Sequence, residues 1–161
     1  MNKTGVIYGI NGPVVYLKGN TGFKMSEMVY VGKERLVGEV IALTKDTTTV
    51  QVFEETTGLK PGETVTASGD ALSVTLGPGI LNNIFDGIER PLSEIAKQSG
   101  KYISRGLTVD SLDTEKKWDV HVTVSEGEEL MGGAIIAETQ ETRSIVHKSM
   151  VPPDVNGTVI W

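Results

Sequence analysis

The sequence predicts a mainly β chain made of two β-rich regions joined by a short helical connector. Three observations support this class. Short apolar segments recur about every 8–12 residues before residue 76, a Gly-Pro-rich break with helix-like spacing follows, and strict β alternation returns in the last third. We therefore expect a small β-barrel in residues 1–70, a connector with short helices in 71–109, and a second β-rich domain in 110–161 that is incomplete.

The N-terminal part consists of short candidate strands separated by glycine turns. The clearest turn is Asn11-Gly12-Pro13, because a tight hairpin needs a positive φ that glycine adopts without strain. A second turn is expected over Thr57-Gly58-Leu59-Lys60-Pro61-Gly62. Nothing before residue 76 has helical periodicity. The candidate strands are Gly5–Ile10, Val14–Leu17, Met28–Val31, Arg35–Leu43, Thr48–Phe53, Glu63–Ala67 and Leu72–Leu76.

The connector begins at the breaker Gly77-Pro78-Gly79. After it, apolar residues at helix-like spacing predict a first short helix that ends at Asp86-Gly87; these residues are Ile80, Leu81, Ile84 and Phe85. Pro91 then opens a second predicted helix, Leu92–Gln98, which Ser99-Gly100 closes. Proline suits the first turn of a helix and glycine suits the position after its end.

The last third returns to strands. Alternation in Trp118–Val124 places Trp118, Val120, Val122 and Val124 on one face and Asp119, His121 and Thr123 on the other. Further strands are expected over Leu130–Thr139, over Ser144–Met150 and from Thr158 onward, after the Asn156-Gly157 turn. We expect this last strand to continue past Trp161, so that the chain ends inside it as at a cut.

Composition excludes several classes of function. The chain has 15 basic and 21 acidic residues, a net charge of −6, and its basic residues are dispersed, so nucleic acid is not an expected partner. There is no cysteine, which excludes disulfides, thiolate metal sites and cysteine nucleophiles. No apolar run approaches the roughly 20 residues that cross a bilayer, and the N-terminus lacks a secretory signal. We expect a cytosolic chain without membrane insertion.

No phosphate-binding loop is present in the sequence. A P-loop requires G-x-x-x-x-G-K-[ST], and no such string occurs in these 161 residues. Gly77-Pro78-Gly79 lacks the spacing and the lysine, and its proline removes one amide donor. It is interpreted as a structural turn.

The titratable residues form no catalytic or metal-binding pattern. His121 and His147 have no histidine or cysteine at metal-ligand spacing, and Lys148 beside His147 disfavours a cation there. Glu126, Glu128 and Glu129 are interpreted as a solvated turn, and Glu54-Glu55 as a strand-end pair. The sequence therefore predicts no catalytic, cofactor-binding or metal-binding residues. A free-standing enzyme remains an alternative with no nucleophile–base pair behind it.

The segment Glu128–Val159 resembles lipoyl- and biotinyl-type sandwich domains, in which a lysine at a hairpin tip carries the cofactor. The alignment places the tip near Gln140–Arg143, where no lysine stands, and Lys148 falls in the return strand. A lipoyl- or biotin-type carrier module is thus the alternative function. A modified lysine, seen as added mass, would decide for it.

Taken in order, these segments resemble the start of the A subunit of V- and A-type rotary ATPases. The most specific string is Leu76-Gly77-Pro78-Gly79-Ile80-Leu81, followed by Ile84-Phe85-Asp86-Gly87-Ile88-Glu89-Arg90-Pro91-Leu92. The other strings that carry the resemblance are Gly5–Val15, Val52–Glu63 and His147–Pro152.

The resemblance implies a six-stranded-type N-terminal β-barrel, a short connector, and the β-rich "bulge" insertion of A subunits, of lipoyl or barrel-sandwich type. It implies a non-catalytic assembly portion, because the nucleotide domain that uses Mg-ATP lies further along family members. The implied partners are B subunits of the hexamer and central and peripheral stalk subunits. The implied parent couples ATP hydrolysis or synthesis to H+ or Na+ transport, as part of the soluble sector at the cytoplasmic side of the membrane. The sequence leaves the ion and the direction open.

Overall fold

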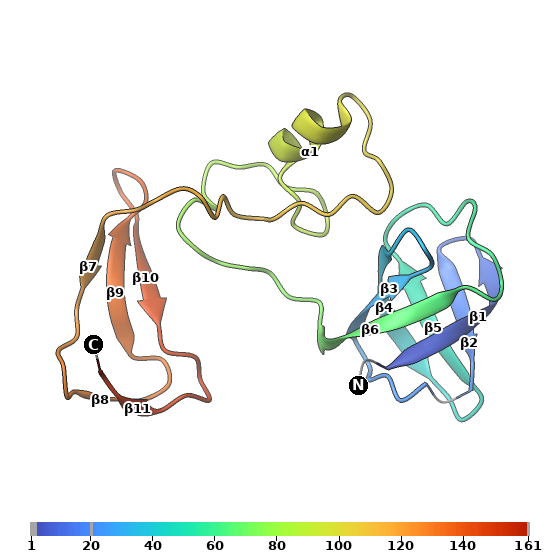
Figure 1. The fold of residues 1–161 in the computed structure, drawn as a ribbon, viewed down its shortest axis with the longest axis horizontal. Coiled ribbons are helices and arrows are strands. Elements are labelled where there is room, and N and C mark those ends of the chain that lie inside the picture. Colours follow the sequence, from blue (N-terminus) through green and yellow to red (C-terminus); the bar gives the residue numbers. More distant parts are fainter. Residues whose placement is uncertain (1–2, 20, 161) are drawn as a thin grey trace. The chain divides into compact units, whose positions relative to one another are not determined.

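The computed structural model describes residues 3–19 and 21–160, and its N-terminal region is a closed β-barrel (Figure 1). Its strands are β1 (Thr4–Asn11), β2 (Val14–Lys18), β3 (Glu27–Val31), β4 (Leu36–Leu43), β5 (Thr47–Val52) and β6 (Thr64–Ala71). They pair in the order β1-β2-β5-β4-β3-β6, and β1 pairs with β6 to close the barrel. All of these pairings are antiparallel. The predicted mainly β class and the predicted barrel are confirmed.

The barrel interior is filled by one apolar cluster. Alternate residues of each strand point inward, as the period of two requires, so that β3 alternates between buried and half-buried positions along its length. The cluster consists of Ile7, Val15, Leu17, Phe23, Val29, Val31, Leu36, Val40, Val50, Val52, Val65 and Ala67. Valine dominates because a β-branched side chain packs well on a pleated surface.

The two predicted turns of this region form as expected. Asn11 pairs with Val14, so Gly12 and Pro13 alone connect β1 to β2, and Gly12 has a φ of +57°. In the second turn the Gly62 amide donates to the Ile7 carbonyl at 2.8 Å, which ties this loop to β1.

Leu72–Leu76 was predicted as a strand, and this prediction is wrong. β6 runs on to Ala71, and the chain then leaves the barrel without entering a ladder. The segment has the composition of a strand, but β3 begins at Glu27, which already pairs with Ala71, and β1 pairs with β6 only over residues 64–66. Beyond Ala71 neither neighbouring strand offers residues with which Leu72–Leu76 could pair.

The first predicted helix, over Ile80–Phe85, is also absent. Gly79 and Asn82 have φ values of +104° and +66°, which a right-handed helix excludes. Residues 77–90 form turns instead, with a bridge between Phe85 and Pro91. The second predicted helix is confirmed as α1 (Leu92–Ser99), and the Gly100 amide donates to the Ala96 carbonyl at its end.

The C-terminal strands form two small sheets. β7 (Val120–Val122), β9 (Ile135–Gln140) and β10 (Val146–Met150) make a three-stranded sheet in the order β10-β9-β7, and β8 (Glu129–Leu130) pairs with β11 (Gly157–Thr158). The expected Leu130–Thr139 strand is interrupted at Gly132, where a Cβ would lie 2.2 Å from the Pro153 carbonyl oxygen. The predicted Trp118–Val124 strand shortens to β7. The predicted course of the chain at Trp161 lies outside the described residues.

The chain divides into two compact units, Met1–Val74 with Glu94–Val109, and Thr75–Ser93 with Asp110–Trp161. The first unit contains the barrel and the second contains both small sheets. The predicted domain limits at residues 70 and 109 stay predictions. Within residues 3–19 and 21–160, no helix is long and apolar enough to cross a membrane.

Candidate functional site

The barrel carries an exposed aromatic patch on its outer surface. Val6 and Tyr8 flank the buried Ile7 on β1, so the alternation turns both outward, and they remain 54% and 52% exposed. The Tyr16 ring of β2 lies 6.2 Å from the Tyr8 ring, at an interplanar angle of 43°. We call Val6, Tyr8 and Tyr16 the exterior patch. Aromatic side chains left outside a filled core are typical of contact surfaces between proteins.

The chain after α1 returns to the barrel through Arg105 and Gly106. The Arg105 guanidinium donates to the backbone carbonyls of Glu55 and Thr57 and pairs with the Glu34 carboxylate at 2.9 Å. The Gly106 amide donates to Glu54 Oε2 at 2.8 Å. These contacts, the Arg105 clasp, fasten residues 105–106 to the loops that follow β3 and β5.

Glu54 and Glu55 were interpreted as a strand-end pair, and the structure gives them fixed partners. Besides the bond from Gly106 to Glu54, the Thr57 hydroxyl donates to Glu55 Oε1 at 2.6 Å. Arg105 was not singled out from the sequence. Its partners lie 48 to 71 residues away along the chain, so no local pattern could have indicated it.

The Gly77-Pro78-Gly79 turn binds a carboxylate of its own chain. Glu141 Oε1 accepts hydrogen bonds from the amides of Gly79 at 2.8 Å and Leu81 at 2.9 Å. Two amides that converge on one oxygen resemble an anion-binding arrangement. Here the anion is a protein side chain, which agrees with the interpretation of this segment as a structural turn.

The turn that follows is organised by Asp86. Its Oδ1 accepts hydrogen bonds from the amides of Ile88 and Arg90, and its Oδ2 accepts one from Arg90 Nε at 2.8 Å. Burial alone would raise the pKa of Asp86, but the bonds from Arg90 and Ile88 stabilise the carboxylate and lower its pKa overall. Arg90 is itself buried. The pair therefore shapes the turn and leaves no exposed charge for a reaction.

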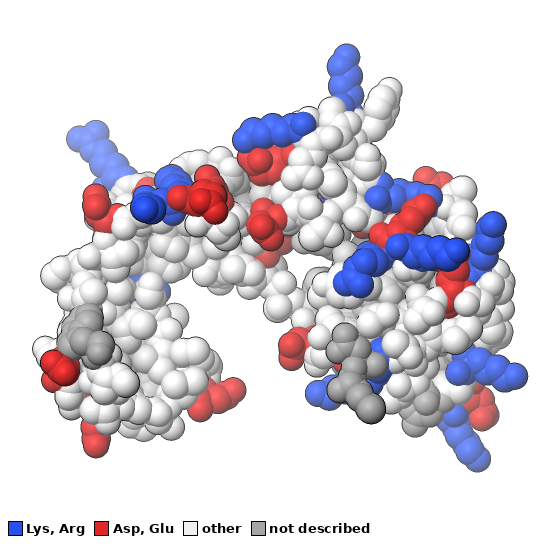
Figure 2. Space-filling view, in the orientation of Figure 1, with Lys and Arg blue, Asp and Glu red and all other residues white. Residues whose placement is uncertain are grey.

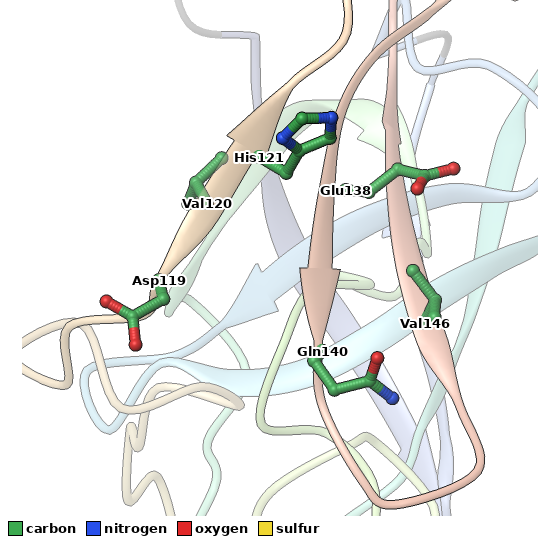
Figure 3. Close-up of a pocket in the computed structure, with 6 residues that line it drawn as sticks. All are labelled: Asp119, Val120, His121, Glu138, Gln140 and Val146. Carbon is green, nitrogen blue, oxygen red and sulfur yellow. The ribbon is translucent and has the colours of Figure 1, made fainter.

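One open cavity of about 340 Å³ lies on the three-stranded sheet (Figure 3). His121 stands directly across from Glu138, whose carboxylate is 3.7 Å from Lys148 Nζ. The carboxylates of Asp119 and Glu138 point away from each other in Figure 3. The residues that line the cavity are Asp119, Val120, His121, Glu138, Gln140 and Val146. Among the described residues, no three His, Cys, Asp or Glu side chains are grouped to hold a metal ion.

The remaining candidates from the sequence are His147 and three glutamates at and before the start of β8. His147 pairs with Thr139 across β9 and β10, so it projects on the sheet face opposite to its neighbour Lys148. Glu128 Oε2 accepts a hydrogen bond from the Ser125 amide and closes its turn. Glu126 and Glu129 are exposed.

The hairpin tip lies where the sequence placed it. β9 ends at Gln140 and β10 begins at Val146, so the tip loop is Glu141–Ile145 and contains no lysine. Lys148 lies inside β10, paired with Glu138. A carrier lysine would need to stand at the tip, so the geometry does not favour this alternative.

Two family models match the chain. Residues 7–69 match the β-barrel domain of the ATP synthase alpha/beta family, and residues 109–161 match the barrel-sandwich domain of ATP synthase alpha/beta subunits. The first range covers nearly all of the closed barrel. The second covers both small sheets, which agrees with the predicted sandwich type.

Similar proteins match over nearly the whole chain. It is 51% identical to a V-type ATP synthase alpha chain of Halothermothrix orenii over 99% of its length, and 52% identical to V-type ATP synthase alpha chain 2 of Clostridium tetani over 96%. It is 51% identical over 97% of its length to the A subunit of an A-type ATP synthase from Methanosphaera stadtmanae. The matched regions make up 27%, 26% and 27% of these relatives, so the chain spans about a quarter of their length.

Proposed function

This chain belongs to the A-subunit (alpha-chain) family of V- and A-type ATP synthases, whose N-terminal region it matches, and on this premise we propose that it is a non-catalytic assembly module. The observation that carries the proposal is the closed barrel with its exterior patch. The barrel satisfies its own core and strand edges, so the patch is free to contribute contact area to a neighbour.

The proposed neighbours are B subunits, whose barrels would alternate with this one in a six-membered ring. Stalk subunits are the proposed partners of the second unit. Figure 2 shows a broad face with few charges over the β7–β11 region, with acidic side chains at its margin. Val120 and Val122 of this region are exposed. Such a face is better suited to contact with another protein than to contact with a polyanion.

Association with a purified B subunit of a V/A-type ATP synthase tests the barrel's role. The Tyr8→Ala chain should bind about ten-fold more weakly or worse, because truncating an aromatic anchor commonly costs more than about 1 kcal/mol. Tyr102→Ala is the matched control, since Tyr102 is exposed and lies outside the barrel. Equal binding by the parent chain and Tyr8→Ala would refute a contact through the exterior patch.

We further propose that the whole protein couples ATP hydrolysis or synthesis to transport of H+ or Na+, using Mg-ATP bound by residues outside these 161. This portion would need no cofactor, because its sequence has no P-loop. The whole protein would act in the cytoplasm as part of a soluble sector held at the membrane. Calorimetric titration of this chain with Mg-ATP should show no binding in the micromolar range, and a micromolar Kd would contradict the proposal.

A further inference from the structure

We propose that the β9–β10 hairpin tip is a docking element that fastens the three-stranded sheet to the Gly77–Leu81 loop through the carboxylate of Glu141. The observation is the pair of hydrogen bonds at 2.8 and 2.9 Å from the Gly79 and Leu81 amides to one oxygen of Glu141. The bonded residues are 62 and 60 positions apart in sequence and belong to the same compact unit. The inference does not depend on the function proposed above.

The loop needs an external acceptor because its backbone cannot satisfy itself. Pro78 has no amide hydrogen, and the Ile80 amide already donates to the Gly77 carbonyl at 3.3 Å. Gly79 has a positive φ, and the amides of Gly79 and Leu81 both donate to an acceptor outside the loop, Glu141. Partly buried amides without acceptors would be unfavourable, because they lose their hydrogen bonds to water. A single carboxylate oxygen satisfies both.

The tip presents Glu141 in a fixed position. The Glu141 amide donates to the Ile145 carbonyl at 3.1 Å, and the Thr142 amide donates to the same carbonyl at 3.2 Å. The Gln140 side-chain amide donates to the Thr142 carbonyl at 2.6 Å. These bonds hold the loop closed on itself, so little side-chain and backbone entropy is lost when the carboxylate binds the amides.

The glycines of the loop also lie close to apolar side chains of the same unit. A Cβ on Gly79 would lie 3.3 Å from the Trp118 ring, and a Cβ on Gly77 would lie 2.7 Å from Leu112. Trp118 and Leu112 lie in the segment before β7. This segment therefore packs against the Gly77–Leu81 loop, which the hairpin tip also contacts. The tip is therefore engaged inside the unit, whereas a carrier hairpin must present its tip to solvent.

Hydrogen exchange of the Gly79 and Leu81 amides, measured by NMR on the full chain, tests the proposal. Glu141→Ala should accelerate exchange at both amides about ten-fold or more, since a hydrogen bond to a charged group contributes more than about 1.4 kcal/mol. Glu141→Gln keeps an acceptor and should retain intermediate protection. Glu138→Gln is the control, because Glu138 lies on β9 three residues before Glu141 and pairs with Lys148 instead.

Exchange at both amides within two-fold of the parent in Glu141→Ala would overturn the docking role. If Glu141→Ala unfolds the second unit entirely, exchange at the Gly79 and Leu81 amides of Glu141→Gln decides the test. Intermediate protection supports the proposal, and exchange as slow as in the parent contradicts it. Selective acceleration at Gly79 and Leu81, with the other amides of that unit unchanged, supports the proposal. Unchanged exchange at those two amides refutes it.

Discussion

The first and second units of this chain are each stabilised by a different kind of force. Among the described residues, the buried aliphatic and aromatic side chains belong to the first unit, which also buries the polar Glu27 and Thr48. The buried side chains of the second unit are Arg90, Pro91 and Thr139. A closed barrel has an interior into which alternate residues point, whereas a three-stranded open sheet has two faces and no interior. The first unit is thus stabilised by apolar packing, and the second by polar contacts such as Asp86–Arg90 and the Glu141 junction.

The largest expected effect comes from the barrel core. Leu36→Ala should lower the free energy of unfolding by about 3 kcal/mol, because Leu36 is fully buried and its truncation leaves a cavity. Val122→Ala in the open sheet, at a residue 45% exposed, should change it by less than about 0.5 kcal/mol. Urea unfolding followed by far-UV circular dichroism gives both values. Equal losses would contradict the contrast between the units.

A polar substitution should instead act on the second unit. Asp86→Asn should destabilise it by about 2 kcal/mol, because the bonds from the Arg90 guanidinium and the two amides lose their charged acceptor. Trp118 fluorescence in urea reports this unit. In the same unit, Glu138→Gln breaks only the surface pair with Lys148 and should cost less than about 0.5 kcal/mol. The proposed role of Asp86 is wrong if both substitutions cost the same.

Adding a single methyl group at Gly106 should weaken the Arg105 clasp and lower the stability of the first unit. Gly106→Ala would place a Cβ 2.1 Å from the Glu34 carbonyl oxygen, whereas Gly62→Ala meets no atom within 4 Å. Both glycines have positive φ, so both substitutions carry the left-handed penalty of about 1–2 kcal/mol. Gly106→Ala should lower the free energy of unfolding by about 1 kcal/mol more than Gly62→Ala does. It should also accelerate hydrogen exchange of the amides around position 106. Indistinguishable unfolding energies would show that the clasp adds no stability.

The smallest expected effect is a dependence on pH. The folded-state pKa of Asp86 is lowered, so its stabilising contribution is complete above the unfolded value of about 3.9 and is lost as pH falls through the folded value. The second unit should therefore be less stable at pH 3 than at pH 6, by less than Asp86→Asn costs. Urea midpoints at the two pH values measure this. The same dependence in Asp86→Asn would assign it to another group.

Local patterns in the sequence were sufficient for the regular elements. Short apolar segments between glycine turns predicted the barrel strands, Gly12 predicted the first hairpin, and Pro91 with Gly100 bounded α1. The same reasoning failed at Leu72–Leu76 and at Ile80–Phe85. In the first case no neighbouring strand extends past Ala71 to pair with the segment, and in the second Asn82 has a left-handed φ that a right-handed helix excludes. Propensity indicates what a segment can form, and its neighbours decide whether it does.

The sequence by itself thus determined the mainly β class, the barrel strands, α1 and the family. Only the tertiary structure decided that Arg105 returns to the barrel and that Glu141 closes on the Gly77–Leu81 loop. The reason is one of range. Strand and helix preferences act between residues a few positions apart, while both of these contacts join residues 48 or more positions apart. A charged side chain in the sequence carries no sign of which distant amide or carboxylate it will meet.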